Sequence, residues 1–107
     1  MSRITVDTAR LPVLLNDREE DQMKARVAAN HPERGKLSEP VVRRATVLLV
    51  ASRDGSVSFA SLIRSSGDEY VDRAAEEIGS KLRFGPATLD GIPFDMRFRY
   101  TMGFEIQ

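Results

Sequence analysis

The clearest hydrophobic pattern in the chain lies near its C-terminal end, between residues 94 and 106. Apolar and polar residues alternate there without a break, and the apolar set is Phe94, Met96, Phe98, Tyr100, Met102, Phe104 and Ile106. Successive side chains of a β-strand point to opposite faces, whereas a helix would scatter these residues around its axis. The pattern therefore predicts one long strand with an apolar face that the rest of the chain must cover.

Two further strands are predicted upstream, joined by a tight turn. Residues 45–51 are almost continuously apolar, which is typical of a central strand covered on much of both faces. Residues 53–56 contain Asp54-Gly55 and favour a hairpin, because Asp and Gly tolerate the positive φ that such turns need. The return strand follows from Val57.

Two helices are also predicted. The first begins at Asn16 or Asp17, both of which have capping-box spacing to a glutamate, and it ends near residue 30. Its apolar stripe is thin, so we expect it on the surface. The second follows residues 65–68, with Ser66 as the expected cap. Its apolar face supplies the cover that the last strand requires and consists of Val71, Ala74, Ala75, Ile78 and Leu82.

These elements predict an α+β fold. A three-stranded antiparallel sheet is covered on one face by a helix and is accompanied by an N-terminal surface helix. With 107 residues the chain is expected to form a single domain. Residues 1–40 are the N-terminal extension, with a short strand at residues 3–6, a helix and a loop, and residues 41–107 form a ββαβ core.

Composition narrows the classes of function. Sixteen basic and sixteen acidic residues cancel, there is no cysteine, and His31 is the only histidine. Balanced charge does not demand nucleic acid as a partner, and one histidine without cysteine offers no transition-metal ligand set. No apolar run approaches the roughly 20 residues of a membrane span. No nucleophile–base pair or phosphate-binding glycine loop is present. We expect no enzyme activity, no cofactor, no metal, no nucleic-acid partner and no direct membrane span.

The predicted last strand carries the candidate binding site. If the hairpin pairs its first strand with the last strand, the last strand keeps one free edge. Unpaired backbone N–H and C=O groups on such an edge are a template for adding another strand. The arginines on its polar face would guard this edge or pair with acidic groups of a partner. The candidate partner-binding residues are Asp95, Arg97, Arg99, Tyr100, Thr101 and Gly103.

Five short motifs in this order and spacing resemble the C-terminal domain of the TonB energy-transducer family. They are Asp54-Gly55-x-Val57, Ser65-Ser66-Gly67, Val71-Asp72-Arg73-Ala74-Ala75, Arg83-Phe84-Gly85-Pro86-Ala87 and Asp90-Gly91-Ile92-Pro93. The resemblance covers about residues 11–106. His31-Pro32 stands where many members have Tyr-Pro, and Ala45 where they often have Gly, and neither departure threatens the fold.

The resemblance implies a non-catalytic protein-binding module on the periplasmic side of a Gram-negative cell envelope. It would capture an extended peptide, such as the TonB box of a TonB-dependent receptor, by strand addition beside the last strand. The sequence lacks the membrane anchor and Pro-rich spacer of a full transducer, so we expect an excised domain or a member with another use. The alternative is a soluble accessory or structural subunit docked to a membrane protein complex, without energy transduction. A homodimer formed through the last strand is compatible with both.

Overall fold

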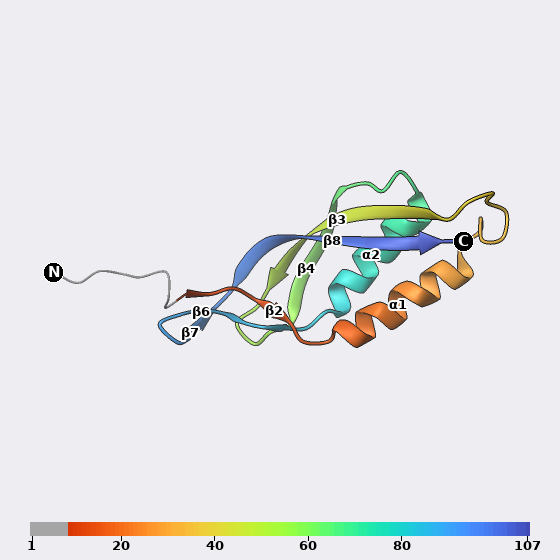
Figure 1. Cartoon of the computed structure of the whole chain (residues 1–107). Helices are drawn as coiled ribbons and strands as arrows, with labels where there is room; N and C mark the ends of the chain where they lie inside the picture. Colours follow the sequence, from red (N-terminus) through yellow and green to blue (C-terminus); the bar gives the residue numbers. More distant parts are fainter. Residues whose placement is uncertain (1–8) are drawn as a thin grey trace.

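The computed structural model describes residues 9–107, and the strand expected at residues 3–6 lies outside them. Figure 1 shows a three-stranded sheet with two helices on one face and a set of short strands at one end. The helices are α1 (Asp17–Asn30) and α2 (Glu69–Lys81). The strands of the main sheet are β3 (Val41–Ala51), β4 (Val57–Arg64) and β8 (Met96–Ile106). The short strands are β1 (Ala9–Arg10), β2 (Val13–Leu14), β5 (Phe84–Gly85), β6 (Ala87–Leu89) and β7 (Ile92–Phe94).

The main sheet is antiparallel and has β3 at its centre, in the order β4-β3-β8. β3 pairs with β8 along its whole length, from Val41 opposite Ile106 to Ala51 opposite Met96. β3 and β4 are joined by the predicted turn, in which Gly55 has a φ of 90°. The α+β fold, with a three-stranded antiparallel sheet and two helices, is confirmed.

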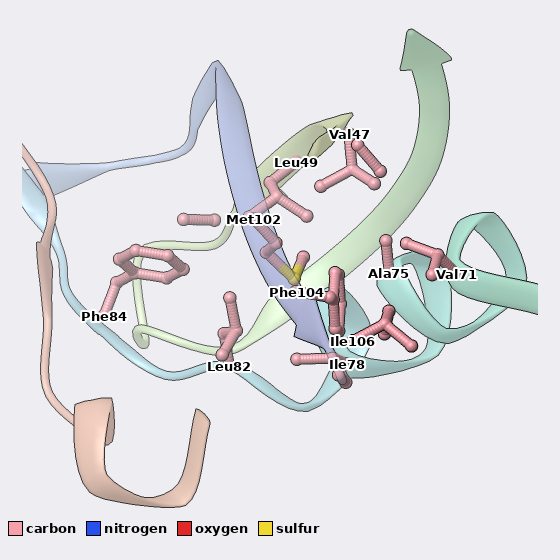
Figure 2. Close-up of a cluster of buried hydrophobic side chains, with 12 residues drawn as sticks. Val47, Leu49, Val71, Ala75, Ile78, Leu82, Phe84, Met102, Phe104 and Ile106 are labelled. Atoms are coloured by element: carbon pink, nitrogen blue, oxygen red, sulfur yellow. The ribbon is translucent and has the colours of Figure 1, made fainter. Parts of the chain in front are cut away.

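The core lies between the sheet and the helices (Figure 2). Alternate residues of β3 and β8 point to this side, and α2 contributes its apolar face. The largest fully buried side chains are Phe104, Leu49, Leu82, Met102, Ile106, Val47 and Val71. Burying each such large apolar side chain contributes about 1.5–3 kcal/mol, so this layer is the main source of stability. α1 adds Met23, Val27 and Ala28 at its margin.

The last strand is shorter than predicted. β8 begins at Met96, because Asp95 separates it from β7. Phe94 belongs to the β6–β7 hairpin, where it pairs with Ala87, and 40% of its surface is exposed. The turn that returns the chain onto β6 uses Asp90 and Gly91, both in the left-handed region of φ. The seven-residue apolar row is therefore divided between two sheets.

The central strand is covered on one face rather than on both. Ala45, Val47 and Leu49 are fully buried, whereas Leu48 and Val50 on the other face are only half-buried. The two helices pack on one side of the sheet, and within residues 9–107 no element covers the opposite side.

Both predicted helix caps are replaced by other contacts. The Asn16 side chain makes no cap bond to α1. Its Nδ2 donates to the Lys81 carbonyl at 3.1 Å, and its Oδ1 accepts from the Arg83 N–H at 2.8 Å, so it fastens α1 to the end of α2. α2 is capped by Asp68, which accepts from the Val71 N–H, and not by Ser66.

The short strands form a second ladder that the sequence pattern did not predict. Residues 9–14 run antiparallel to residues 84–89, with Ala9 opposite Leu89 and Leu14 opposite Phe84. A hydrogen bond from the Leu15 N–H to the Arg83 carbonyl (2.8 Å) extends the same register. β7 pairs with the other side of β6, which gives the order β1-β6-β7.

Candidate functional site

A hydrogen bond on β4 shows which way the backbone groups of the main sheet point. The Leu62 N–H donates to Glu76 Oε2 of α2 at 2.8 Å, so Leu62 directs its backbone groups away from β3. In an antiparallel ladder, successive residues direct these groups to opposite sides of the strand. Val47 lies opposite Leu62 and therefore directs its own groups toward β8, where it lies opposite Tyr100.

It follows that β8 presents a specific set of backbone groups at its free edge. The even-numbered residues, such as Tyr100, bond to β3. The odd-numbered residues point away from β3 and are Arg97, Arg99, Thr101, Gly103 and Glu105. In the part of the chain that the structure describes, no strand other than β3 pairs with β8. Just beyond β8, the Gly35 N–H donates to the Gln107 carbonyl at 2.8 Å, which closes the edge at its C-terminal end.

The side chains of the same odd-numbered residues lie on the uncovered face of the sheet. Arg97 and Arg99 are exposed, and the Thr101 hydroxyl is 2.8 Å from that of Thr46 on β3. Gly103 leaves room between β3 side chains, since a Cβ there would lie 3.8 Å from Arg44 Cγ. Four of the six predicted site residues therefore share one edge and one face.

The charge on this face is predominantly positive. Arg44 faces the same side as Arg97 and Arg99. Arg64 of β4 lies opposite Thr46, next to a register shift, and so belongs to the same face. Glu105 is the acidic residue of the β8 set. A partner strand beside β8 would place alternate side chains next to Arg97 and Arg99, where acidic groups would be favoured.

Asp95 lies outside the edge. Its Oδ1 accepts from the Arg53 N–H at 2.9 Å and lies 3.7 Å from Arg53 Nε. These contacts tie the β7–β8 junction to the β3–β4 turn. Asp95 thus holds the beginning of β8 in place.

Tyr100 points toward the helices and not toward the open face. Its ring meets Phe84 edge-on at a centroid distance of 6.0 Å. Partial burial raises the pKa of Tyr100 far above its ordinary value, and its hydrogen bond with the buried Glu20 of α1 raises the pKa further. Tyr100 therefore connects β8 to α1, and its side chain is not available to a partner on the uncovered face.

The histidine has a role that its sequence neighbours do not reveal. His31 ends α1, is buried, and places Nε2 2.6 Å from Asp68 Oδ2 at the start of α2. The Glu33 N–H donates to His31 Nδ1 at 3.0 Å, so Nε2 carries the ring proton and donates to Asp68. Partial burial raises the pKa of Asp68, but the hydrogen bonds from His31 and from the Val71 N–H outweigh this and hold it below 3.8.

The remaining surfaces offer little chemistry. Among residues 9–107, no three His, Cys, Asp or Glu side chains come together as a group that could hold a metal ion. No helix of the described chain is long and apolar enough to cross a membrane. A cavity of about 200 Å³ lies between α1 and α2, with Met23, Val27, Tyr70 and Ile78 in its wall. No family model matches the chain, and no curated protein matches it.

Proposed function

We propose that this chain is a non-catalytic protein-binding module that captures an extended peptide by strand addition at β8. The observation that carries the proposal is the free edge of β8, where the odd-numbered residues from 97 to 105 direct their N–H and C=O groups away from β3. Backbone bonds to an added strand would supply affinity, and the side chains beside Arg97 and Arg99 would supply selectivity.

The edge is suited to capture because it is both long and firmly supported. β8 has 11 residues and pairs with β3 along all of them, so an incoming strand meets a fixed template. Phe104 and Ile106 are buried in the core and anchor β8 to it. Arg97 and Arg99 discourage uncontrolled edge pairing, since a second copy of β8 would bring like charges together.

The motif series supports a more specific version of the proposal. The chain resembles the C-terminal domain of the TonB family, and we infer a place on the periplasmic side of a Gram-negative envelope. The captured peptide would then be the TonB box of a TonB-dependent receptor. Capture of this peptide requires neither catalysis nor a cofactor.

Substitution at the edge tests the proposal. Proline at Arg99 removes an outward N–H without removing a bond to β3, so Arg99→Pro should weaken binding of a synthetic TonB-box peptide at least tenfold by calorimetry. Arg99→Ala is the matched control, because it removes the same side chain but keeps the N–H. Circular dichroism would establish that both variants are folded. Equal affinity of the two folded variants would contradict backbone capture.

A second candidate function is a soluble accessory or structural subunit docked to a membrane protein complex. It is favoured by the uncovered face of the main sheet, where Val42, Phe59 and Ile63 are each about half exposed. A permanent partner would cover these side chains. Phe59→Ser would then abolish assembly while leaving peptide capture at β8 unchanged, which separates the two functions.

A further inference from the structure

The second ladder carries an apolar face of its own, apart from the edge of β8. Residues directly opposite each other in a ladder share a face, and alternate residues along a strand return to it. Leu89 and Ile92 therefore lie in one row, and Ala87 and Phe94 lie in the next. Arg10 lies opposite Thr88 and Val13 lies opposite Gly85, so alternation along residues 11–15 places Leu11, Val13 and Leu15 on this same face. A Cβ at Gly85 would lie 3.7 Å from Leu15 Cδ2, which agrees with this placement.

This face is unusually exposed. The exposed fraction of the residue surface is 70% for Leu11, 64% for both Val13 and Leu15, and 69% for Ile92. Leu89 and Phe94 are about two-fifths exposed. Ten large hydrophobic residues are exposed in the part of the chain that the structure describes, and these six are on one face. We call this set, Leu11, Val13, Leu15, Leu89, Ile92 and Phe94, the apolar end face.

The area of the apolar end face matches what a dimer needs. Its six side chains expose on the order of 500 Å², which is near the upper end for a single patch on a monomeric protein. A standard interface buries roughly 800 Å² on each partner, and about two-thirds of a homodimer interface is apolar. One such face on each copy supplies that apolar share.

The charges around the apolar end face also suit a second copy. The six residues of the apolar end face are uncharged, and the charged residue that shares their side is Arg83, which lies opposite Leu15. The whole chain has a formal net charge of zero, so self-association meets little electrostatic repulsion. Arg83 lies just before β5, and Asp90 lies just after β6, so the two residues are at opposite ends of this segment. A twofold axis that runs across the strands reverses their direction, so Arg83 of one copy approaches Asp90 of the other.

We propose that the apolar end face is a homodimer interface, in which the second ladders of two copies stack face to face about a twofold axis. This contact is independent of strand addition and leaves the edge of β8 free. A dimer formed in this way presents two capture edges in one particle.

Sedimentation velocity from micromolar to millimolar concentration tests this interface. The wild-type chain should form a dimer. Ile92→Lys should raise the dissociation constant about a hundredfold or more, because each dimer would bury two unpaired ammonium groups. Ile63→Lys is the control, since it introduces the same charge on the uncovered face of the main sheet and should leave the constant within about twofold. Leu11→Lys repeats the test at a second position of the face, and circular dichroism establishes that each variant is folded.

Three results would overturn the interface. The first is a wild-type chain that stays monomeric at millimolar concentration, whether or not it binds phosphatidylcholine vesicles. The second is a dimer that both Ile92→Lys and Leu11→Lys leave intact. The third is a dimer that Arg99→Pro abolishes, because that dimer would use the edge of β8. If Arg99→Pro abolishes peptide capture but leaves the dimer intact, the result bears only on the proposed function and not on the homodimer interface.

Discussion

The contact between Gly55 and Phe84 leads to the sharpest stability prediction. A Cβ at Gly55 would lie 2.2 Å from the Phe84 carbonyl oxygen, and the φ of Gly55 is 90°. An alanine there would be strained by about 1–2 kcal/mol from its backbone conformation alone. The clash adds to this, because a backbone carbonyl cannot rotate away like a flexible side chain.

Relief of the clash would have to displace the chain at Phe84. That movement would break the 2.8 Å hydrogen bond from the Phe84 N–H to the Gly55 carbonyl, which is worth about 1 kcal/mol. It would also loosen the packing of the Phe84 ring, which is buried and lies edge-on to Phe98 at 5.1 Å. We therefore expect Gly55→Ala to lower the free energy of unfolding by about 3–5 kcal/mol.

Gly91→Ala is the matched control. Gly91 has a φ of 80°, but nothing lies within 4 Å of its Cβ position. Only the conformational strain remains, so we expect a loss of about 1–2 kcal/mol. Urea unfolding followed by circular dichroism compares the two variants directly. Equal losses would show that the Gly55–Phe84 contact does not hold the second ladder against the main sheet.

Two further predictions concern the core and the junction between the helices. Phe104→Ala should lower the free energy of unfolding by about 3–5 kcal/mol because Phe104 is fully buried. Thr101→Ala on the open face should lower it by less than about 1 kcal/mol. Comparable unfolding midpoints of the two variants in urea would refute the face assignment. The pKa of Asp68 is lowered in the folded protein, so its ionised form contributes stability above pH 3.8 that is lost as the pH falls through the folded value. Asp68→Ala should therefore lower the free energy of unfolding by about 1–2 kcal/mol at pH 7, because the helix cap and the His31 contact are lost, and by less at pH 3. A loss that does not change with pH would contradict the assigned role of the ionised carboxylate.

The main sheet was predictable because its signals are local. The alternation in β8 and the Asp54-Gly55 turn each depend on residues close together in the sequence. The apolar content of β3 predicted its position at the centre of the sheet, but the prediction that β3 is covered on both faces was wrong. A run of apolar residues does not distinguish a strand covered twice from one that leaves Leu48 and Val50 half-buried.

The second ladder could not be predicted from strand length. β1 and β2 have two residues each, and Pro12 interrupts the segment between them. A signal was nevertheless present, since Leu11, Val13, Leu14 and Leu15 form a short apolar run around Pro12. The same ladder ended the last strand early by taking Phe94 into its own pairing with Ala87.

The site was only partly predictable because some side chains have partners far away in the sequence. The odd-numbered positions of β8 follow from alternation alone. Tyr100 instead meets Glu20 of α1, and Asp95 meets Arg53 of the hairpin turn. His31 likewise meets Asp68, 37 residues later. Such pairs depend on how the helices are placed, which spacing within one element does not reveal.

The central claim is that the odd-numbered residues of β8 form a free edge that captures a strand. Amide hydrogen exchange measured by nuclear magnetic resonance tests it residue by residue. In the free protein, the amides of Phe98 and Tyr100 should exchange slowly because they bond to β3, and those of Arg97, Arg99 and Thr101 should exchange fast. Saturation with a TonB-box peptide should slow the second group and leave the first unchanged. Slow exchange of Arg97, Arg99 and Thr101 in the free protein, or protection by the peptide confined to α1, would contradict the claim.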